Sequence, residues 1–200
     1  MKNAPRSVTR ALLRRSALTY ARRGWKVLPG ASSAGSRFDC GTVSCPTSNC
    51  HPAHDELGVD LLSTSDIMLI DQWWQKWPHS VLLSTGVNFD VLEVPAYLGE
   101  ITTAYLAERG PRCPTAIAAG GRWMLFVAPG DPLRPELHRQ FDIVLHGKGS
   151  WVPAPPSPHP TGHVRWEVAP KSLNWTLPNS YPVQHALVEA LQVAAPRPAA

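Results

Sequence analysis

One short stretch, residues 89–95 (FDVLEVP), limits what this chain can fold into. It follows the apolar run at residues 81–84 and a Thr-Gly turn signal, and its alternating apolar and polar residues predict a half-buried β-strand. A strand that carries acids can hold metal ions, and the acids here are Asp90 and Glu93. Because side chains alternate between the two faces of a sheet, residues three apart point to opposite sides. This strand alone therefore cannot aim both carboxylates at one metal.

The segments around this strand predict a mixed α/β arrangement. Helical periodicity with capping and stop residues predicts helices over residues 7–23, 63–76, 96–109 and 182–194. Short apolar runs bounded by turn residues predict strands over residues 25–28, 81–84, 89–94, 115–118, 123–127, 143–146, 151–153 and 163–168. Residues 115–127 and 143–153 each have the pattern of a β-hairpin with a Gly-containing turn. This order of elements indicates one mixed α/β domain.

The second predicted helix carries two tryptophans, and a third follows directly after it. Its apolar residues fall at helical spacings: Ile67, Ile70, Trp73, Trp74 and Trp77. Such a pattern more often forms a core stripe than a platform on which nucleic-acid bases stack. We therefore interpret the three tryptophans as structural.

The positive charge of the chain is concentrated at its start. Residues 1–38 contain nine Lys or Arg and no acid, whereas the rest of the chain has 10 basic and 15 acidic residues. Such a segment can contact phosphate or form a solvated helix face, and charge alone does not separate the two. An Arg-rich start also occurs in organellar transit peptides, but this one continues directly into the predicted strand at Trp25. No apolar run reaches the ~20 residues needed to cross a bilayer. We therefore expect a cytoplasmic protein without a membrane partner.

Residues 29–54 form a Gly-, Ser- and Cys-rich segment that is too long for a structureless loop in a compact domain. Its candidate ligands are Cys40, Cys45, Cys50, His51 and His54. Thiolates and imidazoles are preferred zinc ligands, and clustered cysteines in a reducing cytoplasm more often bind metal than form disulfides. We predict a structural zinc ion in a loop over about residues 37–54, held by Cys40, Cys45, Cys50 and His51. The adjacent Cys50 and His51 need not both reach one ion, and His54 is the alternative to His51.

From residue 11 to about residue 178, the chain resembles the bifunctional DNA primase/polymerase amino-terminal domain, a branch of the archaeo-eukaryotic primase superfamily. The motifs that carry the resemblance are residues 17–29 (ALTYARRGWKVLP), 45–52 (CPTSNCHP), 73–78 (WWQKWP), 84–86 (STG), 120–122 (GGR) and 151–162 (WVPAPPSPHPTG). Their number and order carry the resemblance more than any single motif does. The form of residues 89–95 is similar to a variant strand of actinobacterial relatives.

The resemblance implies an α+β, prim-pol-like fold in which helices flank a mostly antiparallel central sheet and the zinc loop is an insertion. We expect this domain to cover residues 1–180, followed by a carboxy-terminal helix and a Pro/Ala tail over residues 181–200. Members of the family join nucleotides on a DNA template. Two metal ions are held by an Asp-x-Asp pair on one strand and a third acid on a later strand, and a His in a Gly-Gly-x-His motif contacts the nucleotide.

The resemblance also shows which of these groups the chain has replaced. It places Glu93 at the first acid, Pro95 at the second, Trp123 at the nucleotide-contacting His and Val144 at the third acid. Asp142, two residues before Val144, is a substitute acid on the expected strand. Carboxylates lower the cost of gathering two divalent cations beside a triphosphate. We therefore expect a degraded two-metal centre, which favours a non-catalytic protein over an enzyme.

These expectations favour a non-catalytic nucleic-acid or nucleotide-binding module, in which Arg122, His146 and Lys148 contact phosphate. One alternative is residual template-dependent nucleotidyl transfer, with Glu93 and Asp142 holding a single Mg²⁺ or Mn²⁺ and Asp90 as a further candidate acid. Another alternative is a protein-interaction scaffold in regulation. The expected partners are DNA or a nucleotide, together with a separate helicase or a regulatory protein.

Overall fold

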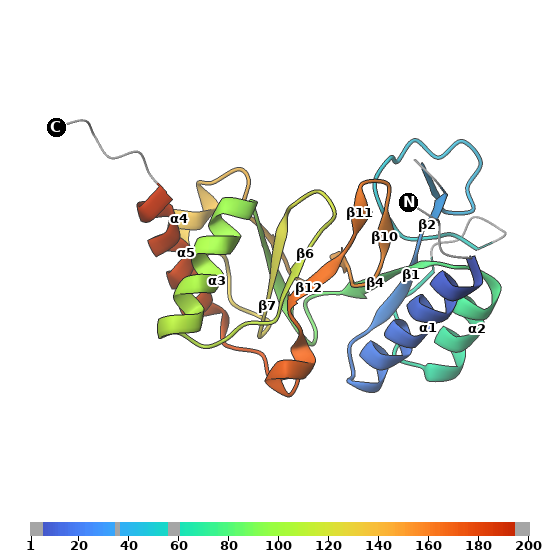
Figure 1. Cartoon of the computed structure of the whole chain (residues 1–200), viewed down its shortest axis with the longest axis horizontal. Helices are drawn as coiled ribbons and strands as arrows, with labels where there is room; N and C mark the ends of the chain where they lie inside the picture. The colour runs from blue at the N-terminus through green and yellow to red at the C-terminus, as the bar shows by residue number, and fades with distance from the viewer. Residues whose placement is uncertain (1–5, 35–36, 56–60, 195–200) are drawn as a thin grey trace. The chain divides into compact units, whose positions relative to one another are not determined.

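The computed structural model describes residues 6–34, 37–55 and 61–194, and the chain forms two compact units (Figure 1). Unit 1 comprises Met1–Ser84 and Trp151–Arg165, and unit 2 comprises Thr85–Ser150 and Trp166–Ala200. Each unit is therefore built from two separate segments of the chain. In both units, helices pack against an antiparallel sheet, as expected for the α+β fold class.

Unit 1 contains a three-stranded antiparallel sheet and two helices. The sheet has the order β1 (Val27–Gly30), β4 (Ser80–Ser84) and β9 (Trp151–Pro153). Helices α1 (Arg6–Arg22) and α2 (Ile67–Lys76) pack against each other and against this sheet. Their buried side chains recur at helical spacings: Leu13, Ala17, Tyr20 and Ala21 in α1, and Ile70 and Trp74 in α2. Both helices were predicted from this periodicity, and both are confirmed.

Helix α2 begins and ends where its local sequence requires. The Asp66 carboxylate accepts hydrogen bonds from the backbone N–H groups of Met68 and Leu69, which makes Asp66 a side-chain N-cap. The helix ends at Lys76, two residues before Pro78, because a proline and the residue before it disfavour helical geometry.

The aromatic residues of α2 divide between the core and the surface. Trp74 is fully buried, and its indole N–H donates to the backbone carbonyl of His79 at 2.8 Å. The His79 ring packs edge-on against Trp74, and burial lowers the pKa of His79 to about 4. Trp77, in contrast, is 59% exposed. The prediction that Trp77 is a core residue is therefore wrong, because the helix ends at Lys76 and Trp77 leaves the helical face.

Two short hairpins and the cysteine-containing loop complete unit 1. The hairpins are formed by β2 (Ser32–Ala34) with β3 (Arg37–Asp39), and by β10 (Pro158–His159) with β11 (Gly162–His163). The loop is bound to the end of β1 by a bridge between Gly30 and Pro52. Next to this bridge, the backbone N–H of Ala31 donates to the carbonyl of His51 at 2.7 Å. The loop is thus held against the three-stranded sheet.

Unit 2 contains a five-stranded sheet with the order β12-β6-β7-β5-β8. Its strands are β5 (Asp90–Val94), β6 (Thr115–Ile117), β7 (Trp123–Val127), β8 (Val144–His146) and β12 (Arg165–Val168). Strand β5 pairs antiparallel with both β7 and β8, and β6 pairs antiparallel with β7. The predicted hairpin over residues 115–127 is confirmed.

Helices cover one face of this sheet. Helices α3 (Ala96–Arg109) and α5 (Ser180–Ala194) pack together, and the short helix α4 (Pro135–His138) contacts α5 (Figure 1). A 3-10 helix, η1 (Pro170–Leu173), follows β12. The core between helices and sheet includes Leu92, Val94, Leu125 and Val127 from the strands and Leu98, Leu106, Val183 and Leu187 from the helices. Within the described residues, no helix combines the length and the apolar composition needed to span a bilayer.

The predicted hairpin over residues 143–153 is wrong. Strand β8 pairs with β5 in unit 2, whereas β9 pairs with β4 in unit 1, so the two strands lie in different sheets. The four residues between them, Gly147 to Ser150, carry the chain from one unit to the other instead of closing a hairpin. A Gly-rich segment of this length can close a hairpin or connect strands of two different sheets. Its composition does not distinguish the two, which depend on the strands that each neighbour pairs with.

Candidate functional site

The acidic strand predicted from the sequence is β5, which lies between β7 and β8 in unit 2. Glu93 stands opposite Met124 of β7 and Val144 of β8. Asp90 pairs with Val127, whose side chain belongs to the core beneath the helices. Asp90 and Glu93 therefore lie on opposite faces of the sheet, as the pleat requires.

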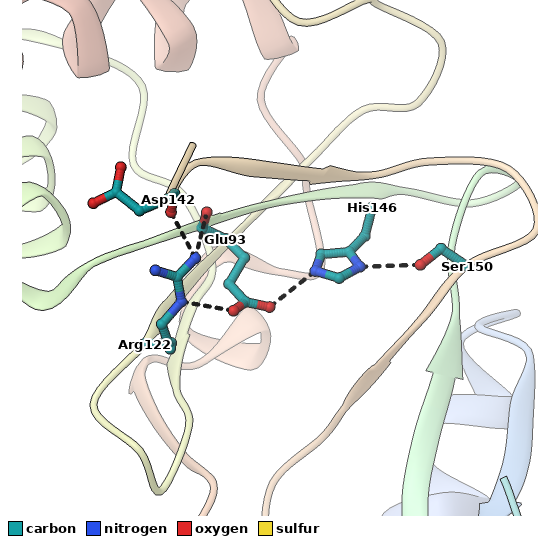
Figure 2. A network of polar contacts seen from close by, with 5 residues as sticks. All are labelled: Glu93, Arg122, Asp142, His146 and Ser150. Atoms are coloured by element: carbon teal, nitrogen blue, oxygen red, sulfur yellow. Dashed lines mark hydrogen bonds and ion pairs between the residues drawn. The ribbon is translucent and has the colours of Figure 1, made fainter. Parts of the chain in front are cut away.

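The Glu93 carboxylate has a basic side chain on each oxygen (Figure 2). The Arg122 Nε donates to Oε1 at 2.7 Å, and His146 Nε2 lies 2.9 Å from Oε2. Burial acts to raise the pKa of Glu93, but hydrogen bonds from His146 and Arg122 outweigh it and hold the pKa below its usual range. The side chain is therefore a carboxylate at neutral pH, and two basic groups already occupy it.

Arg122 connects three segments of unit 2. It lies in the turn between β6 and β7, and its Nη2 donates to the backbone carbonyl of Asp142 at 2.7 Å. The same nitrogen donates to the carbonyl of Glu93 at 3.4 Å. One guanidinium thus contacts both the strand that carries Glu93 and the turn before β8.

His146 extends this network into the turn after β8. Its Nδ1 lies 3.0 Å from the hydroxyl oxygen of Ser150. Because the Glu93 carboxylate can only accept, His146 donates from Nε2, and its Nδ1 accepts from Ser150 when the ring is neutral. The contacts form a continuous chain from Ser150 through His146 and Glu93 to Arg122, drawn in Figure 2.

The other predicted acids do not join Glu93. Asp142 lies in a turn before β8, its side chain is exposed, and its carboxylate points away from Glu93 in Figure 2. Asp90 is 4% exposed, and its Oδ2 accepts from the backbone N–H of Gly130 at 2.9 Å. The structure therefore brings one carboxylate and two basic side chains together at the centre of the sheet face.

Two further positions singled out from the sequence are also placed. Trp123, which the resemblance aligns with a nucleotide-contacting His, packs into the core beside Gly99. Lys148 is exposed, and its backbone lies against Gly86, where an added Cβ would be 2.1 Å from the Lys148 Cα. The Thr85 hydroxyl donates to the carbonyl of Gly147 at 2.6 Å, so the turn that carries Lys148 is anchored on both sides.

A second cluster of chemically active side chains lies in the loop of unit 1. Ligand atoms of Cys40, Cys45 and His51 all lie within 4.8 Å of one another and could hold a metal ion. The His51 Nε2 is 3.5 Å from the Cys45 sulfur, and its Nδ1 is 2.7 Å from the carbonyl of Asn49. Because a carbonyl can only accept, Nδ1 carries the proton and Nε2 presents its lone pair to the two thiols, as metal-binding histidines do.

The remaining predicted ligands are placed differently. Cys50 is not part of this three-residue cluster, and burial raises the pKa of its thiol to about 11, which the nearby Ser80 hydroxyl lowers only in part. His54 donates its backbone N–H to the carbonyl of Cys40 at 2.7 Å. Of the two candidate histidines, His51 is the one whose ring joins the described cluster.

Sequence reasoning named Arg122, His146 and Glu93 separately and did not predict that they bind one another. Arg122 and Glu93 are 29 residues apart, and His146 and Glu93 are 53 apart. Their contact depends on the pairing of β5 with β7 on one side and with β8 on the other. The predicted hairpin over residues 143–153 had instead paired β8 with β9, so it hid the contact between β8 and β5. The available signal was the presence of basic residues in the turns that flank the strands beside Glu93.

The α+β architecture, the acid on the central strand and the Cys/His loop are the features expected of a primase/polymerase-like domain. A family model described as bifunctional DNA primase/polymerase, N-terminal (Prim-Pol), matches residues 17–182. The chain therefore belongs to this family. A search of curated proteins finds no match.

Proposed function

We propose that this chain is a non-catalytic nucleic-acid or nucleotide-binding module whose former catalytic position binds phosphate without a divalent metal. The observation that supports this proposal is the saturation of Glu93 by Arg122 and His146. A two-metal centre needs several carboxylates to lower the cost of gathering two divalent cations. Here a single carboxylate is already neutralised by side chains.

The charge of this position suits an anion. Glu93 contributes one negative charge, Arg122 one positive charge, and His146 a second positive charge when it is protonated. Lys148, in the following turn, adds another exposed cation. Guanidinium groups bind phosphate oxygens in a planar, bidentate geometry, and this geometry needs no metal. An incoming phosphate would compete with Glu93 for Arg122.

Nucleotide binding by single variants tests the proposal. We expect a fluorescent nucleoside triphosphate to bind the wild-type chain in EDTA, and Arg122→Gln to weaken this binding by about tenfold or more, as for a lost charged hydrogen bond. The matched control is Arg109→Gln, because Arg109 is an exposed arginine on α3 whose guanidinium lies over Tyr105.

Primer extension distinguishes the main alternative, in which Glu93 and Asp142 hold one metal for residual nucleotidyl transfer. We expect no extension of a primed template with either Mg²⁺ or Mn²⁺. Extension that disappears in Glu93→Gln and Asp142→Asn but persists in Asp131→Asn would contradict the proposal and establish the alternative. Asp131 is an exposed aspartate in the same unit and serves as the control.

For the loop of unit 1, we propose that the loop binds a structural zinc ion held by Cys40, Cys45 and His51. Two sulfurs and one nitrogen form a donor set typical of zinc. A cytoplasmic location, which keeps the thiols reduced, belongs to this proposal. We expect one zinc per chain by metal analysis, loss of zinc in Cys45→Ser, and retention in Cys113→Ala. Loss of zinc in Cys50→Ser would assign the fourth ligand, and retention would exclude Cys50.

A further inference from the structure

The four cysteines of the chain fall into two groups, and only one group brings two sulfurs close together. The sulfurs of Cys40 and Cys45 and a ring nitrogen of His51 all lie within 4.8 Å of one another. Cys50 and Cys113 are not part of this cluster, although all four cysteines are free thiols. Two sulfurs must approach to about 2 Å to form a disulfide, so Cys40 and Cys45 are the pair whose geometry favours one.

Burial protects the other two cysteines from oxidation. Cys113 is 4% exposed, and its thiol donates to the backbone carbonyl of Phe126 at 3.0 Å. Burial raises the pKa of the Cys113 thiol, and it raises the pKa of the Cys50 thiol to about 11. Because the thiolate is the form that attacks an oxidant, these two thiols stay protonated and unreactive at neutral pH.

The two clustered sulfurs differ in their access to solvent. Cys40 is 3% exposed, whereas Cys45 is half-buried. A small oxidant that arrives from solvent therefore meets Cys45 first. The four residues between the two cysteines, 41–44, are all exposed, so this segment can shift without disturbing the core. Such a shift brings the two sulfurs from their present separation to bonding distance.

We infer that Cys40 and Cys45 form a reversible disulfide on exposure to peroxide, and that this disulfide releases the metal from the loop. The Cys45 thiolate attacks one oxygen of hydrogen peroxide, the O–O bond breaks, and a sulfenic acid forms as hydroxide leaves. The Cys40 thiolate then attacks the sulfenic sulfur, and the S–S bond forms as a second hydroxide leaves. The two sulfurs lose two electrons in total, and the peroxide gains them.

Release of the metal follows from the chemistry of its ligands. Thiolates bind zinc, but the sulfurs of a disulfide have no negative charge to offer it. Of the three clustered ligands, only His51 would remain after oxidation. The carbonyl of His51 accepts a hydrogen bond from Ala31 at the end of β1, so loss of the metal also weakens the attachment of the loop to the sheet. Peroxide would thus change the local order of unit 1.

Peroxide treatment of the zinc-loaded full chain tests this inference. A coloured zinc chelator would follow the release of metal, and a thiol reagent would count the free cysteines after denaturation. We expect the bound zinc to be lost and the thiol count to fall from four to two. The intact mass should fall by about 2 Da, since disulfide formation removes two hydrogens. Dithiothreitol with added zinc should restore the starting state, because a disulfide is reducible.

Peptide mapping assigns the pair of cysteines. Trypsin cleavage after Arg37 and Lys76 leaves Cys40, Cys45 and Cys50 in one peptide. After peroxide treatment and alkylation, fragmentation of this peptide should place the alkyl label on Cys50. The same experiment on the untreated chain should place a label on all three cysteines.

Two variants serve as controls for the cysteines outside the cluster. Cys113→Ala should lose zinc and two thiols in the same way as the wild type. Cys50→Ser should still link Cys40 to Cys45, whether or not it retains zinc. Both readouts are covalent, so they remain valid for a variant of lower stability.

Three results would overturn the inference. These are zinc and four thiols retained after peroxide, a disulfide that contains Cys50 or Cys113, and oxidation of Cys45 to a sulfinic or sulfonic acid without a link to Cys40. The release step rests on the proposed zinc site, whereas the disulfide needs only the two cysteines. A chain purified without zinc that still links Cys40 to Cys45 would contradict the zinc site and support the disulfide. A chain that keeps its zinc under peroxide would support the zinc site and contradict the inference.

Discussion

Glu93 and His79 are both partly buried and titratable, but at neutral pH Glu93 is charged and His79 is neutral. Glu93 stays ionised because Arg122 and His146 hydrogen bond to it, and these contacts outweigh the cost of burial. His79 lies between Trp74 and the sheet, where burial favours the neutral ring and its hydrogen bond to the Gly30 carbonyl at 3.3 Å offsets only part of that effect. Glu93 belongs to the candidate site, and His79 belongs to the core of unit 1.

The pKa of His79 predicts how the stability of unit 1 changes with pH. Burial lowers this pKa from 6.5 to about 4, so the unfolded chain binds a proton that the folded chain excludes. Stability should therefore fall as the pH drops below 6.5, by about 3 kcal/mol at pH 4. Chemical denaturation of the wild type and of His79→Gln between pH 7 and pH 4 would measure this loss. The variant should show a shallower decline, and identical slopes would contradict the assignment.

At the scale of elements, packing of α3 on the sheet depends on a glycine. Gly99 lies against Trp123, and an added Cβ would be 2.3 Å from the indole. Trp123 is largely buried in the same core, so neither group can move easily. The close approach explains why a helix interior contains a residue with a poor helix propensity.

Substitutions at two glycines test this contact. Gly99→Ala should lower the free energy of unfolding by about 1–3 kcal/mol, because it overpacks the core despite the better helix propensity of alanine. Gly120→Ala is the matched control, since an added Cβ there meets nothing within 4 Å. Urea denaturation would measure both. Equal stability of the two variants would show that Trp123 yields to the added methyl group.

If the loop of unit 1 binds the proposed zinc ion, its removal should loosen one edge of unit 1 and leave unit 2 unchanged. The loop contacts the end of β1 through the N–H groups of Ala31 and Ala53, which donate to His51 and Pro29 at 2.7 and 2.9 Å. A metal that fixes Cys40, Cys45 and His51 also fixes these hydrogen bonds. After chelation, we expect faster amide hydrogen exchange at Ala31 and Ala53 and unchanged exchange in β5 and β7. Equal exchange at Ala31 and Ala53 with and without chelator would contradict a structural role.

Local sequence patterns predicted the elements better than their pairing. Helix α3 was predicted with its observed bounds, because Ala96 to Arg109 has helical composition and Gly110-Pro111 ends it. The β8–β9 connection was mispredicted, because strand pairing is decided by partners far away in the chain. For the same reason, the sequence indicated which residues are candidates at the site but not that Arg122 and His146 bind Glu93. Trp77 was misassigned because its helical spacing was counted past Lys76, where the helix was predicted to end and does end.

At the scale of the whole molecule, the chain has a primase/polymerase family fold in two units with different charge and different candidate sites. Unit 2 holds Glu93 with Arg122 and His146, and unit 1 holds the Cys/His loop. The family relationship concerns the fold, whereas function depends on the residues at each site. We propose that Glu93, Arg122 and His146 mark the position of the family's metal centre and that this position binds phosphate through side chains.

Diffraction from crystals soaked with Mn²⁺ and a nucleoside triphosphate tests that claim most directly, because the anomalous signal of manganese locates the metal independently of the nucleotide. We predict phosphate density in contact with Arg122 and His146 and no anomalous peak beside the Glu93 carboxylate. A manganese peak bridging Glu93 and Asp142 with the triphosphate bound to it would contradict the claim and restore a metal-dependent centre.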